Sequence, residues 1–144
     1  MEVQVTRAEE KDFGYIQEKI EKYALDGSKL DWRQFFVAKT GEKVVAFGRI
    51  IDFGDFFEIA SLGVDYYHRK KGLGKVMLTF LIQEARKKEA QKPIYGVTHV
   101  PEFVASCGFV PTEDDYPDYL DHKRKHGCRL HASKIKIVKW QDSA

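Results

Sequence analysis

Residues 56–85, FFEIASLGVDYYHRKKGLGKVMLTFLIQEA, join an apolar run, a basic glycine-rich loop and an amphipathic segment without a spacer. Residues 56–64 are short and mostly apolar, which predicts a strand covered on both faces. Residues 72–85 then change to helical spacing. The apolar face predicted for this helix contains Leu73, Val76, Met77, Phe80, Leu81 and Ala85.

The loop between this strand and helix collects positive charge and glycine where the helix should begin. Arg69, Lys70 and Lys71 lead directly into Gly72 and Gly74. Backbone N–H groups and the helix dipole favour an anion at such an end. A Walker A loop and a dinucleotide fingerprint both fail to fit, because positions 69, 76 and 77 lack the residues they need. The alternative is a lysine-rich surface turn that caps an ordinary core helix.

Length and composition predict one globular domain over residues 1–144. The chain is 43% hydrophobic and 32% charged, and its net charge of +2 argues against a general nucleic-acid binder. It has no apolar run of the ~20 residues that span a bilayer, and its start does not resemble a signal peptide. We therefore expect a cytoplasmic protein without a membrane partner. Cys107 and Cys128 are too few for a disulfide framework, so reduced thiols are expected.

The remaining elements follow from apolar periodicity and turn residues. Further strands are predicted at residues 3–6, 35–38, 43–53, 94–98, 109–112 and 133–140, helices at 9–25 and 101–107, and a loop with a short helix at 113–127. The strand–helix–strand unit implies a parallel pair with a right-handed crossover. The last strand alternates with lysines, which predicts one solvated face. The expected fold is α/β (α+β), with a mixed, mainly antiparallel sheet of about six to seven strands, a central parallel pair and helices on both faces.

The glycine loop and its flanks resemble the GNAT family of acetyl-CoA-dependent N-acetyltransferases. Arg69-x-x-Gly72-x-Gly74 is similar to that family's pyrophosphate loop, FFEIASLGV to its fourth strand, and FVASCGFV to its helix-to-strand segment ending in Gly-Phe. Together these cover roughly residues 35–112. The resemblance implies a GNAT-like fold, acetyl-CoA as the donor substrate, and donor-binding residues Leu62, Gly63, Val64, Arg69, Lys70, Lys71, Gly72, Leu73, Gly74 and Lys75.

Within this resemblance, the glycine loop would hold the pyrophosphate of coenzyme A and the backbone of residues 62–64 would pair with the pantetheine arm. A backbone N–H near Gly63 or Val64 could also meet the oxyanion. Gly63 further fits a bulge that separates neighbouring strands and opens a slot. The alternative for Gly63 is a small residue packed under a helix.

Glu58 is the one carboxylate among the apolar residues of the central strand. Desolvation raises the pKa of a lone carboxylate, which suits it to take a proton from an ammonium near neutral pH, directly or through water. The histone-acetyltransferase branch of the resembled family has its general base at this place in the motif. The alternative is a strand-end glutamate paired with a cation such as Arg49.

The general acid is unassigned, because Val104 stands where many members of that family have a tyrosine that protonates the leaving thiolate. Candidates by position alone are Tyr95, His99, Tyr116 and Tyr119.

The C-terminal region contains a second cluster of functional side chains. His122, His126, Cys128 and His131 are metal-ligand types, but their spacing fits no standard finger, so we expect no metal. Arg129, with Ser133 and Lys134 after it, resembles the amino-acid-acetylating branch typified by N-acetylglutamate synthase. That implies an anionic amino acid as acceptor, with Arg129 as a substrate-binding candidate. His99 is a second substrate-binding candidate, by position alone.

The expected function is transfer of an acetyl group from acetyl-CoA to a primary amine of a small molecule, with amino acids as one acceptor class. The alternatives are a protein lysine or N-terminal acetyltransferase and a non-catalytic coenzyme A-binding module, which Val104 favours and Glu58 disfavours. Nucleic-acid binding is disfavoured because Tyr66, Tyr67 and Arg69 lie on a single turn. We expect a monomer or a homodimer.

Overall fold

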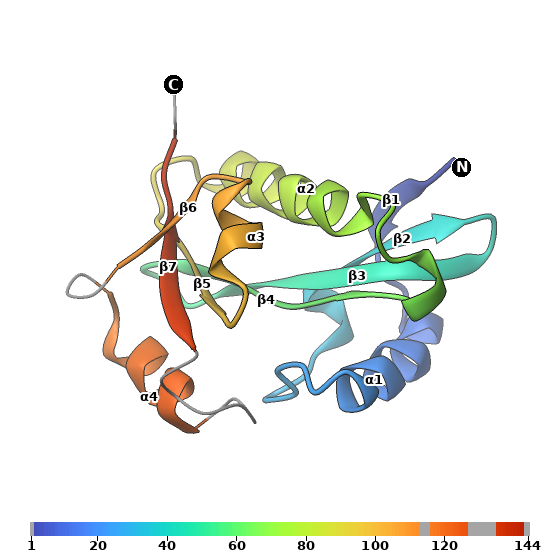
Figure 1. Ribbon diagram of the computed structural model, residues 1–144, viewed down its shortest axis with the longest axis horizontal. Helices are drawn as coiled ribbons and strands as arrows, with labels where there is room; N and C mark the ends of the chain where they lie inside the picture. The colour runs from blue at the N-terminus through green and yellow to red at the C-terminus, as the bar shows by residue number, and fades with distance from the viewer. Residues whose placement is uncertain (1, 113–115, 127–134, 143–144) are drawn as a thin grey trace.

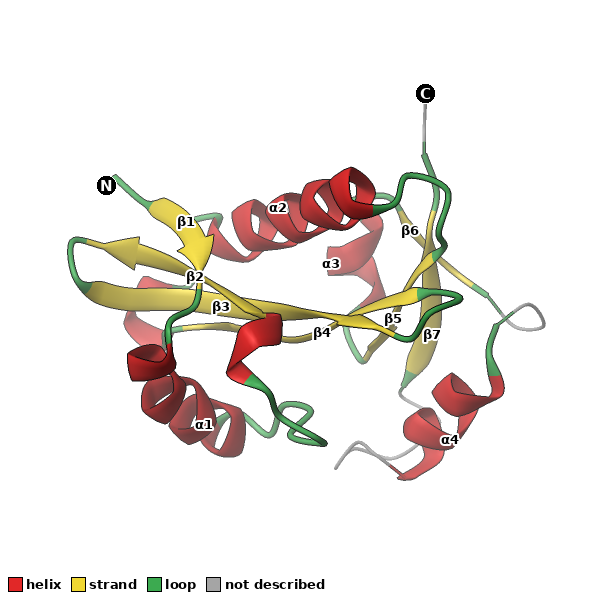
Figure 2. Ribbon diagram, turned by 180° about the vertical axis from the view of Figure 1, so that it is seen from behind, coloured by secondary structure: helices red, strands yellow, loops and turns green. Residues whose placement is uncertain are grey.

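The computed structural model describes residues 2–112, 116–126 and 135–142 as one sheet with helices on both faces (Figures 1 and 2). In this part of the chain the strands are β1 (Gln4–Arg7), β2 (Phe35–Thr40), β3 (Lys43–Asp52), β4 (Phe57–Val64), β5 (Ile94–Thr98), β6 (Phe109–Pro111) and β7 (Lys136–Trp140). The α-helices are α1 (Phe13–Lys22), α2 (Leu73–Lys88), α3 (Pro101–Ala105) and α4 (Asp118–His126). Among these helices, none has both the length and the apolar character needed to cross a bilayer.

The strands lie in the order β1-β2-β3-β4-β5-β7-β6. β4 and β5, which α2 connects, run parallel, and every other neighbouring pair in the described sheet is antiparallel. α2 and α3 cover one face, and α1 and α4 cover the other (Figure 1). The predicted fold class is therefore confirmed, including its central parallel pair.

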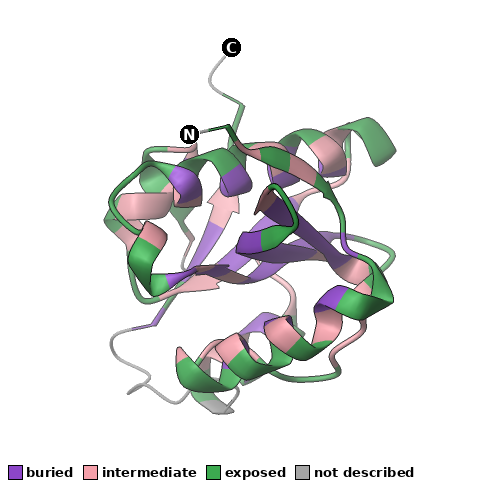
Figure 3. Ribbon diagram, turned by 90° about the vertical axis from the view of Figure 1, so that its right-hand side faces the viewer, coloured by how far each residue is buried: buried purple, intermediate pink, exposed green. Residues whose placement is uncertain are grey.

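The core consists of two layers because neighbouring strand residues point to opposite faces. In β2, Phe35 belongs to a cluster with Ile16 and Ile20 of α1. The next residue, Phe36, meets the ring of Phe80 on α2 at a centroid distance of 5.5 Å. Figure 3 shows the resulting arrangement, in which buried strands lie between two layers of helices.

The buried face of α2 differs from the predicted one. Val76 is 47% exposed, whereas Leu78 and Ile82 are buried. The sequence of this helix carries apolar residues around more than one face, so periodicity alone does not choose among them. Packing against the sheet selects the stripe that contains Leu73, Met77, Leu78, Leu81, Ile82 and Ala85.

Two other elements also depart from expectation. α1 ends at Lys22 instead of continuing to residue 25, because Ala24 adopts a left-handed conformation and the Leu25 N–H bonds back to the Ile20 carbonyl at 2.9 Å. β7 lacks the expected solvated face. It lies between β5 and β6, and its adjacent residues Ile137 and Val138 are both buried, in clusters on opposite faces.

Candidate active site

The parallel strands β4 and β5 separate after two paired positions. Phe57 pairs with Ile94 and Glu58 with Tyr95, but β4 continues to Val64 and β5 to Thr98 without further pairing between them. The sheet therefore opens at its centre, next to the N-terminus of α2. An opening of this kind leaves backbone groups of β4 available to an extended ligand.

A bulge in β4 contributes to this separation. Ala60 pairs with Arg49 and Gly63 with Phe47, so two β4 residues lie opposite one residue of β3. One of the two is Ser61, a buried residue with a φ of 56°. A non-glycine residue in this conformation costs of order 1–3 kcal/mol and persists only where the surroundings enforce it.

The predicted role of Gly63 as the bulge residue is wrong, since the extra residue lies between Ala60 and Gly63. Gly63 instead makes room for a ring. A Cβ atom there would lie 2.5 Å from Cζ of Phe47 and 3.0 Å from Cδ1 of Leu25. A glycine is required here because of an aromatic neighbour on β3, and not because a helix lies over this position.

The basic glycine loop ends where α2 begins. Gly72 is the N-cap of α2 with a φ of 80°, and no side chain caps this end among the residues described. Lys70 also has a positive φ, of 64°. The first turn of α2 contains no acidic residue. Its N–H groups and the nearby lysines therefore form an electropositive end that suits an anionic group.

Side chains around Asp65 fix the start of this loop. Asp65 accepts hydrogen bonds from the Tyr15 hydroxyl at 3.2 Å and from the Tyr67 N–H at 3.3 Å, and its Oδ2 lies 2.9 Å from Nδ1 of His68. Burial raises the pKa of Asp65, but the hydrogen bonds outweigh it and the pKa lies below its ordinary value. The Arg69 Nε donates to the Val64 carbonyl at 3.1 Å, which ties the loop to the end of β4.

A cavity of about 660 Å³ joins the glycine loop to the opposite side of the sheet. Its walls come from the loop, the separated ends of β4 and β5, α3, the segment after α1, and Lys123 of α4. Among the predicted site residues, those lining it are Leu62, Gly63, Val64, Arg69, Lys70, Gly72, Leu73, Gly74, Lys75 and His99. Lys71 and Glu58 do not line it, and Arg129 lies outside the described residues.

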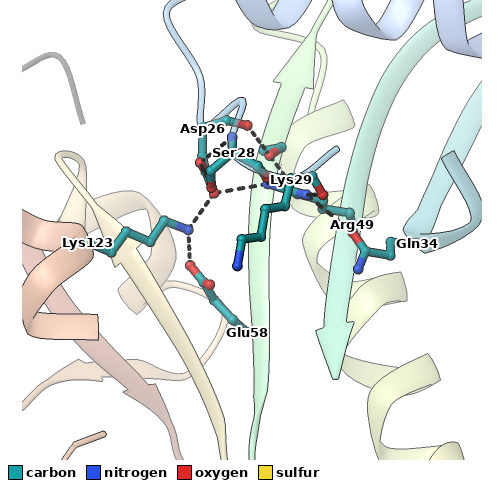
Figure 4. Close-up of polar contacts among 8 residues, drawn as sticks. Asp26, Ser28, Lys29, Gln34, Arg49, Glu58 and Lys123 are labelled. Carbon is teal, nitrogen blue, oxygen red and sulfur yellow. Dashed lines mark hydrogen bonds and ion pairs between the residues drawn. The ribbon is translucent and has the colours of Figure 1, made fainter. Parts of the chain in front are cut away.

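Arg49 organises one end of this cavity from a fully buried position on β3. Its Nε donates to Ser61 Oγ at 3.0 Å, and its Nη2 donates to Asp26 Oδ2 and to the Ser28 carbonyl, both at 3.0 Å. Its Nη1 donates to the Lys29 carbonyl and to Gln34. The guanidinium thus fixes the segment after α1 against the bulge of β4 (Figure 4).

Lys123 of α4 places its ammonium between two carboxylates. Nζ lies 2.6 Å from Oδ2 of Asp26 and contacts Oε2 of Glu58 (Figure 4). All three side chains are more than 90% buried. Glu58 is therefore paired with Lys123, and the expected alternative partner, Arg49, instead bonds to Asp26. The second oxygen of Glu58, Oε1, is buried without a hydrogen-bond partner among the described residues.

Burial and charge act against each other in this group. Burial raises the pKa of Glu58, and Lys123 opposes that effect without cancelling it. Burial also acts to raise the pKa of Asp26, but Lys123 and Ser28 outweigh it, so this pKa is lowered. For Lys123, burial would lower the pKa, and the two carboxylates reverse that to a net increase. The lysine is consequently charged at neutral pH, and Glu58 is the readier proton acceptor of the two acids.

The structure separates the four positional candidates for a general acid. His99 is exposed and lines the cavity, as does Val104. Tyr95 packs edge-on against Phe56, and the ring of Tyr119 contacts that of Phe53 in a tilted arrangement, with the centroids 4.8 Å apart. Tyr116 donates a hydrogen bond to Asp121. Among the described candidates, His99 alone is placed to meet a ligand in the cavity.

No local motif singles out Asp26, which occupies a common Asp-Gly-Ser turn, or Lys123, which is followed by Arg124 and Lys125. The one available signal was Glu58 itself. A lone carboxylate in a core needs a partner, so its burial implies that another residue pairs with it. No group of three or more His, Cys, Asp or Glu side chains in the described ranges is arranged to hold a metal ion.

Residues 3–111 match the model of a protein family described as the acetyltransferase (GNAT) family. This match covers about three quarters of the chain.

Several solved structures share the fold. The N-acetylglutamate synthase of Neisseria gonorrhoeae, complexed with coenzyme A and N-acetyl-glutamate, has a TM-score of 0.80 at 18% identity, over 97% of this chain and 35% of that chain. Rv2747 of Mycobacterium tuberculosis, in complex with CoA, has a TM-score of 0.74 at 23% identity, over 95% and 98%. The Escherichia coli ribosomal-protein-S18-alanine N-acetyltransferase has a TM-score of 0.67 at 16% identity, over 96% of this chain and 93% of that chain. The chain spans about a third of the Neisseria gonorrhoeae chain.

Proposed function

Because the chain belongs to the acetyltransferase (GNAT) family, we propose that it transfers an acetyl group from acetyl-CoA to a primary amine of a small molecule. One observation carries this proposal. One cavity is lined by the electropositive end of α2, by the separated ends of β4 and β5, and by Asp26 and Lys123, which contact the buried Glu58 group. A donor and an amine entering from opposite ends would meet at the gap.

The donor end supplies binding and orientation. The N–H groups at the start of α2, with Lys70 and Lys75, suit the pyrophosphate of coenzyme A. The part of β4 that does not pair with β5 includes residues 62–64 and would offer backbone groups to the pantetheine arm, as expected from the sequence. Two of the similar structures were solved with CoA bound, which supports this assignment.

The acceptor end supplies the base. An ammonium must lose a proton before its nitrogen can attack, and Glu58 is the proposed acceptor of that proton. The amine nitrogen then bonds to the thioester carbonyl carbon, the carbon–sulfur bond breaks, and coenzyme A leaves as a thiolate. The second amine proton neutralises the thiolate through water. Backbone N–H groups at Gly63 or Val64 are the proposed donors to the oxyanion.

The proposed acceptor class is an amine that also carries a carboxylate, such as an amino acid. The likeness to N-acetylglutamate synthase supports this class, as does the basic C-terminal region that contains Arg129. The likeness to the S18-alanine N-acetyltransferase favours a second candidate, a protein N-terminus. A coenzyme A-binding module without catalysis is the third, and the pairing of Glu58 with Lys123 favours it.

An amine panel assayed by release of free thiol from acetyl-CoA tests these alternatives. The panel should contain glutamate, glutamine, spermidine and a short peptide with a free N-terminus. We expect turnover with an amino acid above that with spermidine. Preference for the peptide would support the second candidate. Binding of coenzyme A without turnover of any amine would support the module.

A further inference from the structure

We propose that Asp26 and Glu58 form a binding site for a primary ammonium group, and that the side chain of Lys123 fills this site until an acceptor's ammonium replaces it. The identity of the natural amine rests on the proposed function, but the existence of the site does not. Lys123 is then a stand-in for the substrate and Asp26 is a second acidic residue of the acceptor site.

The geometry around Lys123 is that of a bound alkylammonium. Nζ lies 2.6 Å from Oδ2 of Asp26 and also contacts Oε2 of Glu58. Lys123 is 5% exposed and Glu58 is fully buried. A lysine side chain ends in the same group that a primary amine carries at neutral pH, an ammonium with three N–H donors on one nitrogen. The site thus already holds the chemical group that we assign to it.

Charge balance shows that the site needs a monocation. Two carboxylates face it, and Arg49 offsets one of them. The five N–H groups of Arg49 are all engaged by described residues, namely Ser61, Asp26, Gln34 and the carbonyls of Ser28 and Lys29. If Lys123 withdraws, one buried negative charge is left without an ion-pair partner that the described residues supply, and an ammonium would be held strongly there.

The unused hydrogen-bonding capacity of Glu58 also supports an ammonium site. Oε1 of Glu58 is buried and has no hydrogen-bond partner among the described residues. A buried acceptor without a partner costs roughly 1–3 kcal/mol, and an ammonium with three donors could satisfy it along with the other oxygens. Lys123 approaches from α4 and contacts only Oε2 of this carboxylate.

Access explains why Lys123 has to move. Asp26 and Lys123 line the cavity, whereas Glu58 does not. An amine arriving through the cavity would therefore meet Lys123 before it could reach Glu58. The backbone of α4 need not move, because Leu120 anchors this helix in a cluster with Phe56 and Ile137. The four-carbon stem of the lysine can swing out by rotamer changes alone.

The test uses Lys123→Ala, which empties the site, and ethylammonium as the probe. We expect ethylammonium to raise the Tm of this variant saturably, at least about threefold more than tetramethylammonium at the same concentration, because the quaternary ion has no N–H donor. Lys125→Ala, on the exposed side of the same helix, should show equal shifts with both ions. The double variant Lys123→Ala with Asp26→Asn should lose the ethylammonium shift.

Equal shifts of Lys123→Ala with both ions would overturn the proposal, as would an unchanged ethylammonium shift in the double variant. If Lys123→Ala is recovered unfolded, it is refolded by dilution into ethylammonium or tetramethylammonium and the yields of folded protein are compared. Equal yields would overturn the proposal. The measurement needs no acetyl transfer, so it stands even if the proposed function fails. If that function holds, Lys123→Ala should also acetylate ethylamine several-fold faster than the wild type.

Discussion

Two effects of opposite sign act on the pKa of Glu58. Its burial makes ionisation unfavourable, and the ammonium of Lys123 makes ionisation favourable. The result is a pKa above the ordinary glutamate value. A raised pKa makes the ionised form of Glu58 a stronger base than a surface glutamate, which favours a role as general base.

Glu58→Gln should lower turnover by ~10²–10⁴-fold at pH 7, because positioned bases typically contribute that much. Affinity for coenzyme A should stay unchanged. Part of the lost rate should return as pH rises, because an alkylammonium with a pKa near ~10.4 then deprotonates unaided. Thiol release measured from pH 6 to 9 checks this, with Glu84→Gln on α2 as the control. Wild-type rates in the Gln variant over that range would remove Glu58 from the mechanism.

The pairing of Lys123 with two acids should also appear in stability at alkaline pH. The folded-state pKa of Lys123 is raised above the ordinary lysine value. Its contribution is therefore fully present below about pH 10.4 and is lost as pH rises through the folded pKa. The gap in urea midpoint between the wild type and Lys123→Met should be constant from pH 8 to 10 and narrow at higher pH. A constant gap up to pH 12 would contradict the assignment.

At the scale of elements, clustered lysines surround the start of α2, a helix end that no side chain in the described ranges caps. Lys75→Glu reverses one of those charges in the first turn. It should weaken coenzyme A binding by about tenfold or more, equivalent to at least ~1.4 kcal/mol. Lys87→Glu makes the same change in the last turn and should have little effect on binding. Calorimetric titration of both variants measures the difference, and equal affinities would rule out the loop as the pyrophosphate site.

Gly63 connects β4 to the ring of Phe47 and so couples the opening of the sheet to the packing under α1. Gly63→Ala should destabilise the fold by about 1–3 kcal/mol, because the new Cβ would lie 2.5 Å from Cζ of that ring. Phe47→Leu in the same chain should recover part of the loss. Gly14→Ala, where nothing lies within 4 Å of the added Cβ, should stabilise α1 instead. Urea denaturation of the three variants provides the measurement.

At the scale of the whole molecule, the order of elements was predictable because its signals are local. Apolar alternation, turn residues and one long helical stripe predict each strand and helix from a few neighbouring residues. The predictions fail where contacts between distant segments of the chain determine which face of a helix or strand is buried. The buried stripe of α2 depends on the sheet beneath it. Val138 lies on the side of β7 that carries Lys136 and was predicted to be solvated, yet it is buried in a cluster with Leu81 of α2.

The candidate site divides in the same way. The loop proposed to hold the donor is contiguous in sequence, so its glycines and cations were recognisable together. The proposed acceptor end is built from Asp26, Arg49, Glu58 and Lys123, which come from four separate parts of the chain. Only the folded sheet brings them within hydrogen-bonding distance. Nothing in the neighbouring residues of Asp26 distinguishes it from an ordinary turn.

The cavity that passes through the gap between β4 and β5 has a consequence for steady-state kinetics. Donor and acceptor would occupy opposite ends of it at the same time, so the acetyl group could cross directly within a ternary complex. Initial rates at several fixed amine concentrations should then give intersecting double-reciprocal lines. Free coenzyme A should inhibit competitively against acetyl-CoA but not against the amine. Parallel lines would instead indicate an acetylated protein intermediate and two half-reactions that share one entrance.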